Sequence, residues 1–134
     1  MVENFRAELS QLFDKGVDLL FCNLNEAQLL TETTSIEDCK KKIKTLCKNF
    51  VITCGKDGSI AFDGETEAKS SGVKTTALDT TGAGDIFAGV FLHCLTKTYD
   101  FKYANLLANK FASKLVSRFG ARLTTSEVKE VLKF

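Results

Sequence analysis

The sequence predicts an α/β fold with a largely parallel sheet that continues into helices toward its C-terminal end. Two observations predict this class: helical apolar periods alternate with short apolar runs of strand length, and the later part of the sequence reads as successive helices. The chain has 134 residues, which is the size of one ordinary domain, and 44% of them are hydrophobic, so a buried core can form.

The first three elements are expected in the order helix, strand, helix. Apolar residues recur at helical spacing between Glu3 and Lys15, and Gly16 follows as a natural helix stop. The run from Val17 to Cys22 is nearly all apolar, which is typical of a strand covered on both faces. A short helix is then expected from Asn23 to Thr31, directly at the end of that strand.

The next helix is expected to begin after Ser35, a residue type that caps helix N-termini. Its first turn is acidic and its later turns are basic, as the helix dipole favours. The residues expected on its buried face are Ile36, Ile43, Leu46 and Cys47. A second apolar strand is expected from Phe50 to Cys54.

A strong turn signal, Gly55-Lys56-Asp57-Gly58, follows the second strand. Strands are then expected at Ser59 to Phe62 and near Val73 to Ala77, around a turn at Asp63-Gly64. Three helices complete the prediction. They run from about Asp85 to Thr96, from a cap at Asp100 to about Phe119 with Gly120 as the stop, and from about Ser126 to Leu132.

Composition narrows the classes of function. The 18 basic and 17 acidic side chains give a net charge of +1, which offers no basis for a nucleic-acid or anionic-membrane surface. No apolar run approaches the roughly 20 residues of a membrane span. The five cysteines are odd in number and form no C-x-x-C pair, which predicts reduced thiols rather than disulfides or a zinc ribbon. The start of the sequence lacks the features of a signal peptide, so a cytoplasmic location is expected.

The segment Asp79-Thr80-Thr81-Gly82-Ala83-Gly84-Asp85 carries the most chemical information. It follows an expected strand and opens an expected helix, and the N–H groups of such a helix start suit an anion. Asp85 alone is consistent with an ordinary acid in the first turn of a helix. Beside an anion hole, the same carboxylate can accept a hydroxyl proton while the N–H groups hold charge on a transferred phosphoryl group.

Two other phosphate motifs fit this segment less well. A P-loop requires a lysine after its glycines, and none follows Gly84. A dinucleotide fingerprint is closer, because Gly82-Ala83-Gly84 precedes Ala88, but the sequence then continues through helices and offers no second strand ending in an acid. An NAD-binding domain is therefore the less favoured hypothesis.

The run from Asp79 to Gly89 resembles the C-terminal signature of the ribokinase (PfkB-type) family of carbohydrate and nucleoside kinases. Other segments resemble this family in the right order. They are Asn23-Leu24-Asn25-Glu26 for its N-x-x-E motif, Thr53 to Gly58 for its nucleotide turn, and Ala108-Asn109 with Ser117 to Ala121 for its last helix and the following loop. The resemblance implies a ribokinase-like three-layer αβα sandwich, and the sequence is nearest to bacterial adenosine-kinase-like members.

The resemblance implies ATP-dependent phosphoryl transfer to a hydroxyl of a sugar or nucleoside. Asp85 would be the base, and Gly82, Ala83 and Gly84 would form the anion hole. The nucleotide phosphates would lie along Thr53, Gly55, Lys56, Asp57 and Gly58, with Asn109 near the adenine. Asn23 and Glu26 would act around Mg²⁺, mostly through water. The ligands of a monovalent cation such as K⁺ would be Asp79, Thr81, Leu115, Arg118, Gly120 and Thr124.

The family fold is roughly twice this length, and its glycine-pair motif, its substrate-gripping residues and its β lid have no counterpart here. The resemblance therefore implies that residues 1–134 are one nucleotide-binding, C-terminal portion of a kinase domain. We expect little or no kinase activity from this portion alone, because it cannot position the substrate. The alternative is a non-catalytic nucleotide-binding or assembly module that needs a partner chain. A sheet edge meant for further strands also predicts self-association.

Overall fold

A computed structural model describes residues 5–133 of the chain. The strands are β1 (Val17–Asn23), β2 (Cys47–Thr53), β3 (Ser59–Phe62) and β4 (Glu67–Ser70). The helices are α1 (Arg6–Asp14), α2 (Leu24–Thr31), α3 (Ile36–Leu46), α4 (Ala83–Thr96), α5 (Phe101–Val116) and α6 (Thr125–Leu132), with a short 3₁₀ turn, η1, at Gly55–Asp57. Of the expected first helix, Glu3 lies outside the described residues.

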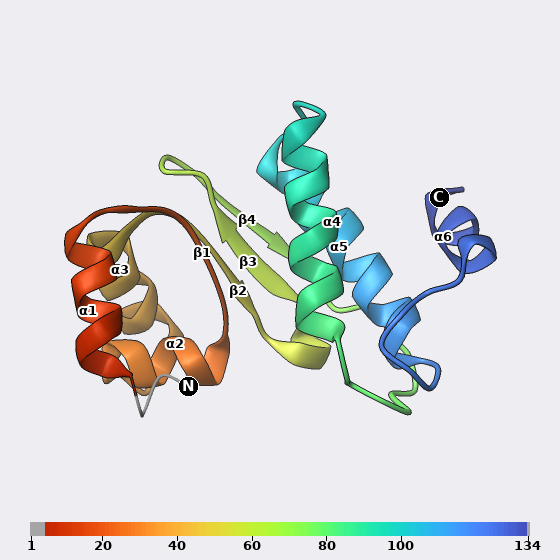
Figure 1. Cartoon of the computed structure of the whole chain (residues 1–134), viewed down its shortest axis with the longest axis horizontal. Helices are drawn as coiled ribbons and strands as arrows, with labels where there is room; N and C mark the ends of the chain where they lie inside the picture. The colour runs from red at the N-terminus through yellow and green to blue at the C-terminus, as the bar shows by residue number, and fades with distance from the viewer. Residues whose placement is uncertain (1–4, 134) are drawn as a thin grey trace.

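The four strands form one sheet in the order β1-β2-β3-β4, with helices on both faces (Figure 1). Helices α1, α2 and α3 lie on one side, and α4 and α5 lie on the other (Figure 1). This is the three-layer α/β arrangement that the sequence predicts. The sheet is mixed, however. Only β1 and β2 are parallel, whereas β2–β3 and β3–β4 are antiparallel. The expectation of a largely parallel sheet is therefore wrong for the described residues, because tight turns join β2 to β3 and β3 to β4.

Each face of the sheet has its own hydrophobic core, because alternate residues of β2 point to opposite sides. Phe50 and Ile52 pack with the helices α2 and α3 through Ala27, Cys39 and Ile43. The residue between them, Val51, packs on the other face. The buried residues of that second core are Val51, Ala61, Phe87, Phe91, Cys94, Ala104 and Ala108. All of these residues are 2% exposed or less.

Helix ends follow the capping residues that the sequence indicates. The Ser35 hydroxyl accepts a hydrogen bond from the Asp38 N–H at 3.1 Å, and the Asp100 carboxylate accepts one from the Tyr103 N–H at 2.8 Å. Helix α5 ends at Val116, before the expected Phe119. Cys47, expected on helix α3, instead begins β2 without an intervening loop.

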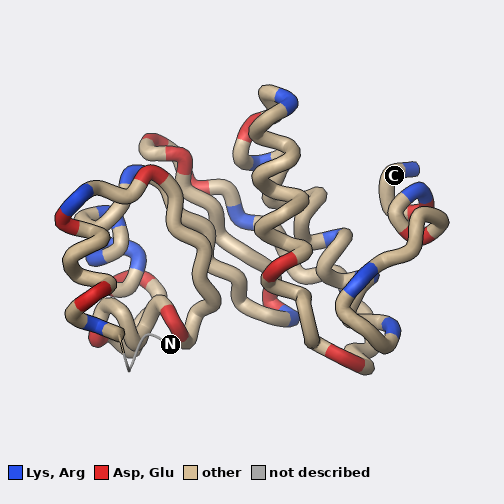
Figure 2. The backbone as a smooth tube through the Cα atoms, in the orientation of Figure 1, with Lys and Arg blue, Asp and Glu red and all other residues tan. Residues whose placement is uncertain are grey.

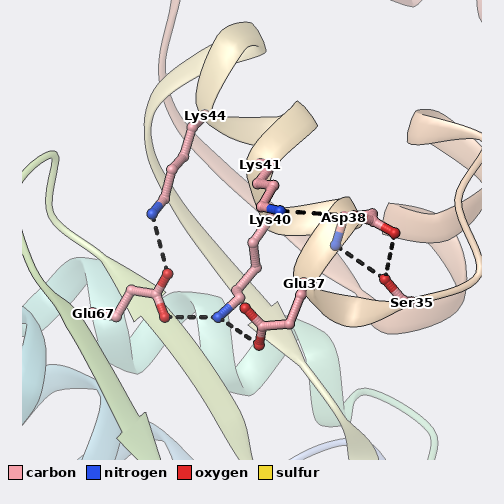
Figure 3. Close-up of polar contacts among 7 residues, drawn as sticks. All are labelled: Ser35, Glu37, Asp38, Lys40, Lys41, Lys44 and Glu67. Carbon is pink, nitrogen blue, oxygen red and sulfur yellow. Dashed lines mark hydrogen bonds and ion pairs between the residues drawn. The ribbon is translucent and has the colours of Figure 1, made fainter.

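The strand expected near Val73 to Ala77 does not form, and the last strand is Glu67–Ser70. The turn at Asp63 sets this register, because its carboxylate accepts hydrogen bonds from the N–H groups of Glu65 and Thr66 at 3.0 and 2.8 Å. Strand β4 is then joined to α3 by ion pairs from Lys40 and Lys44 to Glu67, at 2.9 and 3.2 Å (Figure 3).

All five cysteines are free, and burial raises the pKa of Cys22 to about 12 and that of Cys47 to about 11. Acidic and basic residues are interleaved along the chain at both ends of the molecule (Figure 2). Within residues 5–133, no helix combines the length and the apolar character needed to cross a bilayer.

Candidate active site

A cleft of about 670 Å³ opens at the end of the sheet from which the η1 turn projects. Four segments form its walls: the turn after β2, the segment after β4, the start of α4 and one face of α5. The lining residues are Thr53, Gly55, Lys56, Asp57, Gly58, Gly72, Val73, Lys74, Thr75, Ala77, Thr80, Ala83, Gly84, Phe87, Asn109, Ala112, Ser113 and Val116. The predicted nucleotide turn, two of the three anion-hole residues and Asn109 thus share one cavity.

The turn from Thr53 to Gly58 is held against the chain that follows β4. Gly58 has φ +96°, and a Cβ there would lie 1.9 Å from the Ser70 carbonyl oxygen. A Cβ at Gly72 would likewise lie 1.9 Å from the Lys56 carbonyl oxygen. Only glycine permits both approaches. The turn therefore forms a fixed wall of the cleft, with its backbone close to any ligand.

The start of α4 has the properties of an anion site. Gly82 is the N-cap, with φ +79°, and no side chain caps this helix. The Ala83 N–H donates to the Thr80 carbonyl at 3.2 Å, but no group among residues 5–133 accepts a hydrogen bond from the N–H of Gly84 or Asp85. A Cβ at Gly84 would meet nothing within 4 Å, so the approach is open. The positive end of the helix dipole and these two free donors fit a phosphoryl group.

Asp85 is exposed and lies in the first turn of α4. It follows Gly84, which lines the cleft, but neither Asp85 nor Gly82 is among the lining residues. The Asp85 carboxylate is therefore next to Gly84 in the chain but outside the lining of the cleft, and its role as a base stays a prediction.

Asn109 reaches the cleft from α5 and is only 8% exposed. Its side-chain N–H₂ donates to the Ser59 hydroxyl and, at 2.9 Å, to the Asn105 carbonyl. Ser59 and Asn105 are themselves buried. The amide of Asn109 is thus part of a connected polar group that joins α5 to β3.

Asn23 and Glu26 form a reciprocal capping box at the start of α2. The Glu26 N–H donates to Asn23 Oδ1 at 2.8 Å, and the Asn23 N–H donates to Glu26 Oε2 at 3.0 Å. Neither residue is among the cleft lining. Within residues 5–133, no group of three or more His, Cys, Asp or Glu side chains is arranged to hold a metal ion. A role of Asn23 and Glu26 around a hydrated Mg²⁺ stays a prediction.

The residues expected around a monovalent cation lie in two segments that hydrogen bonds join. The Asp79 carboxylate accepts from the Thr81 N–H at 2.9 Å and from the Gly120 N–H at 3.1 Å, and bonds from these two residues lower the pKa of Asp79. Arg118 donates to the Arg122 carbonyl and pairs with Glu127 at 2.7 Å. Glu127 in turn completes a capping box with Thr124. The remaining candidate, Leu115, is fully buried in α5, and the set as a cation site stays a prediction.

Sequence reasoning missed two parts of the cleft. The segment from Gly72 to Ala77, expected to include a strand, is an exposed wall of the cavity instead. On the α5 face only Asn109 was predicted. The other lining residues of that face were missed, although they follow Asn109 at the i+3, i+4 and i+7 spacing of one helix face: Ala112, Ser113 and Val116. That spacing was the available signal. Phe87 packs in the second core and also lines the cleft.

The fold and the cleft define an α/β protein with a cavity at the end of its sheet, one wall of which is an uncapped helix start with free N–H donors. Comparison with known proteins is more specific. Residues 2–128 match the family model described as pfkB family carbohydrate kinase. The chain therefore belongs to the pfkB family of carbohydrate kinases.

Individual relatives agree with this assignment. The chain is 34% identical over 120 residues to a ribokinase of Lactococcus lactis, covering 87% of this chain and 39% of the relative. Among solved structures, adenosine kinase from Sinorhizobium meliloti superposes with a TM-score of 0.91 at 28% identity, over 98% of this chain and 41% of that one. Arabidopsis thaliana ribokinase complexed with ribose and ATP gives a TM-score of 0.79 at 27% identity, over 93% and 43% of the two chains. The chain thus spans about two-fifths of the length of these relatives.

Proposed function

We propose that this chain is the C-terminal, nucleotide-binding portion of a kinase that transfers the γ-phosphoryl group of ATP to a hydroxyl of a sugar or nucleoside. The observation that carries the proposal is the single cleft shared by the turn after β2, the free N–H donors at the start of α4, and Asn109. Membership of the pfkB family and the likeness to a ribokinase and an adenosine kinase support it.

The N–H groups and the carboxylate at the start of α4 would carry out the transfer. The N–H groups of Gly84 and Asp85 would stabilise negative charge that develops on the phosphoryl oxygens, because they need no reorganisation to do so. The Asp85 carboxylate would accept the proton of the attacking hydroxyl. Bound Mg²⁺ would neutralise phosphate charge, and we propose that Asn23 and Glu26 would contact its water ligands.

The acceptor would be a ribose-type sugar or adenosine, the two classes that the relatives' names include. Residues 5–133 provide the nucleotide cleft, and the resemblance assigns the substrate grip to the part of the fold that is not in this chain. We therefore expect the isolated chain to bind ATP with Mg²⁺ and to turn over little or no sugar, because the hydroxyl is not positioned.

A chimera tests the catalytic role of Asp85. This chain would replace the matching 120 residues of the Lactococcus lactis ribokinase, and ribose phosphorylation by ATP would be measured. Asp85→Asn should lower kcat by about 10²- to 10⁴-fold, the usual contribution of a general base, while leaving ATP affinity nearly unchanged. Asp14→Asn, an exposed acid at the end of α1, is the matched control and should have no effect. Undiminished turnover in Asp85→Asn would remove Asp85 from the role of base.

Binding by the 134-residue chain itself distinguishes the remaining alternatives. Equilibrium dialysis against ATP with Mg²⁺, and separately against NAD, should show retention of ATP alone. Retention of NAD in preference to ATP would favour a dinucleotide-binding domain. ATP binding together with an inactive chimera would favour the non-catalytic module, which binds nucleotide or serves in assembly without transferring phosphate.

A further inference from the structure

The buried polar group behind Asn109 has a defined direction of hydrogen bonding. It consists of Ser59 on β3 and Asn105 and Asn109 on α5, which are 3%, 0% and 8% exposed. Asn105 Nδ2 donates to the backbone carbonyl of Ala68 at 3.0 Å and to that of Ser59 at 3.4 Å. Backbone carbonyls can only accept, so the amide of Asn105 must present its N–H₂ to them and its Oδ1 to Ser59.

The orientation of the Asn105 amide determines the orientation of the Asn109 amide. Ser59 Oγ lies 2.5 Å from Asn105 Oδ1, and an amide oxygen cannot donate, so the hydroxyl proton of Ser59 is committed to Asn105. The Ser59 oxygen is then left as an acceptor for Asn109. The second inner partner of Asn109 is the Asn105 carbonyl oxygen at 2.9 Å, which is also an acceptor. Both inner partners therefore require the N–H₂ of Asn109.

The outer atom of the Asn109 amide is consequently its oxygen. Asn109 lines the cleft, and no donor among residues 5–133 bonds to Asn109 Oδ1. A phosphate group carries only acceptor oxygens at neutral pH, so it cannot satisfy this atom. The groups of a nucleoside triphosphate that can donate to this atom are its ribose hydroxyls and the N–H groups of its base, among them the exocyclic amino group of adenine.

We propose that Ser59 and Asn105 are positioning residues that fix the Asn109 amide with its oxygen facing the cleft, and that this polarity selects a nucleotide whose base carries an amino donor over one with a carbonyl at the same place. The proposal rests on the proposed function, because it requires a nucleoside triphosphate in the cleft. It adds to that function a reason for base preference. We call this series of hydrogen bonds the relay. It runs from the backbone carbonyls of Ser59 and Ala68 through the Asn105 amide and the Ser59 hydroxyl to Asn109, which lines the cleft.

The test is a comparison of nucleotide affinities of the 134-residue chain with Mg²⁺, measured by equilibrium dialysis. The ligands are ATP, ITP, which has a carbonyl in place of the amino group, and N6,N6-dimethyl-ATP, which keeps the nitrogen but has no N–H. We expect ATP to bind about tenfold more tightly than either analogue. Each analogue lacks the N–H group that would donate to Asn109 Oδ1, so one hydrogen bond is lost and this oxygen is left without a donor. Equal binding of ATP and ITP would overturn the relay while leaving the proposed function in place, whereas failure to bind any of the three would overturn both.

Variants separate positioning from simple structural support. Ser59→Ala removes one of the two inner acceptors, so the preference for ATP over ITP should fall about fivefold, to near twofold. Asn109→Leu removes the outer oxygen and should abolish the preference. Ser35→Ala is the matched control, because it also loses a serine hydrogen bond but lies at the start of α3, outside the cleft lining. Its preference ratio should equal that of the unmodified chain, and a fall of the same size as in Ser59→Ala would overturn the proposal.

Discussion

Buried polar side chains in this protein differ in whether their hydrogen-bonding atoms have partners. Asn105, which is 0% exposed, uses both its amide nitrogen and its amide oxygen. Ser70 is the opposite case: it lies directly across from Ser59 in the β3–β4 register, and its buried hydroxyl oxygen has no partner among the described residues. A buried hydroxyl without a partner has lost its hydration without compensation, which costs about 1–3 kcal/mol.

Replacement of Ser70 is therefore expected to stabilise the protein. Ser70→Ala should raise the free energy of unfolding by about 1 kcal/mol, because it removes the unsatisfied hydroxyl and leaves the strand backbone unchanged. Urea denaturation followed by circular dichroism measures this change. Ser10→Ala, at an exposed position on α1, is the control and should leave the midpoint unchanged. A lower midpoint for Ser70→Ala would mean that the hydroxyl is hydrogen-bonded in solution.

At the scale of elements, sequence motifs correctly predict the features that depend on residues close together in the chain, such as helix caps and tight turns. The caps at Ser35 and Asp100 were predictable, because a capping side chain bonds to backbone three residues away. The turn at Gly55 to Gly58 was predictable for the same reason. The close approach of Gly72 to Lys56 was not, because it depends on two segments that meet only in the folded chain.

Strand β4 shows why one element was misplaced. Its sequence, Glu-Ala-Lys-Ser, has little β propensity, whereas the stretch from Val73 to Ala77 contains more β-branched residues. Tertiary contacts decide the outcome. Asn105 holds the Ala68 carbonyl, and Lys40 and Lys44 hold Glu67, so the polar segment pairs with β3. The same limit applies to the site, where the motifs and Asn109 were visible in the sequence but the rest of the α5 wall of the cleft was not assigned.

The connection between α3 and β4 gives a prediction about pH. The side chain of Lys40 is only 6% exposed and pairs with Glu67 at 2.9 Å and with Glu37 at 3.0 Å (Figure 3). Hydrogen bonding from Lys40 is the main cause that lowers the pKa of Glu67. A carboxylate with a lowered pKa in the folded state stabilises the protein fully above its unfolded-state pKa of about 4.3, and this contribution is lost as the pH falls below that value through the lower folded-state pKa.

Glu67→Gln should therefore lower the free energy of unfolding by about 1–2 kcal/mol at pH 7, because Lys40 and Lys44 each lose an ionic partner. The difference from the unmodified chain should shrink as the pH falls from about 5 to about 3, where Glu67 becomes protonated in both states. Denaturation curves at several pH values measure this. Glu65→Gln, in the exposed turn of the same hairpin, is the matched control. A difference that does not depend on pH would show that packing, rather than charge, joins α3 to β4.

At the scale of the whole molecule, the sheet is buried unevenly. Strand β3 is buried along its whole length, whereas within residues 5–133 β1 pairs only with β2 and most of its residues are partly exposed. Leu20 and Cys22 contact the first core, and Leu19 and Phe21 contact the second. A strand with apolar side chains on both faces is typical of the interior of a sheet. Here such a strand forms an edge, with one row of backbone groups left for another strand.

We therefore expect the isolated chain to associate through the free edge of β1. Light scattering after size-exclusion chromatography should give a mass above the 14.7 kDa monomer, and the mass should rise with protein concentration. Leu19→Lys should shift the population to monomer, because a lysine can lay its stem on apolar surface and place its ammonium group against an incoming strand. Phe119→Ser is the control for general surface stickiness, since Phe119 is 73% exposed and lies far from β1 in the sequence, and this variant should still associate. A mass of 14.7 kDa at every concentration would show that the edge does not pair with a second copy, and dissociation by Phe119→Ser alone would place the contact elsewhere.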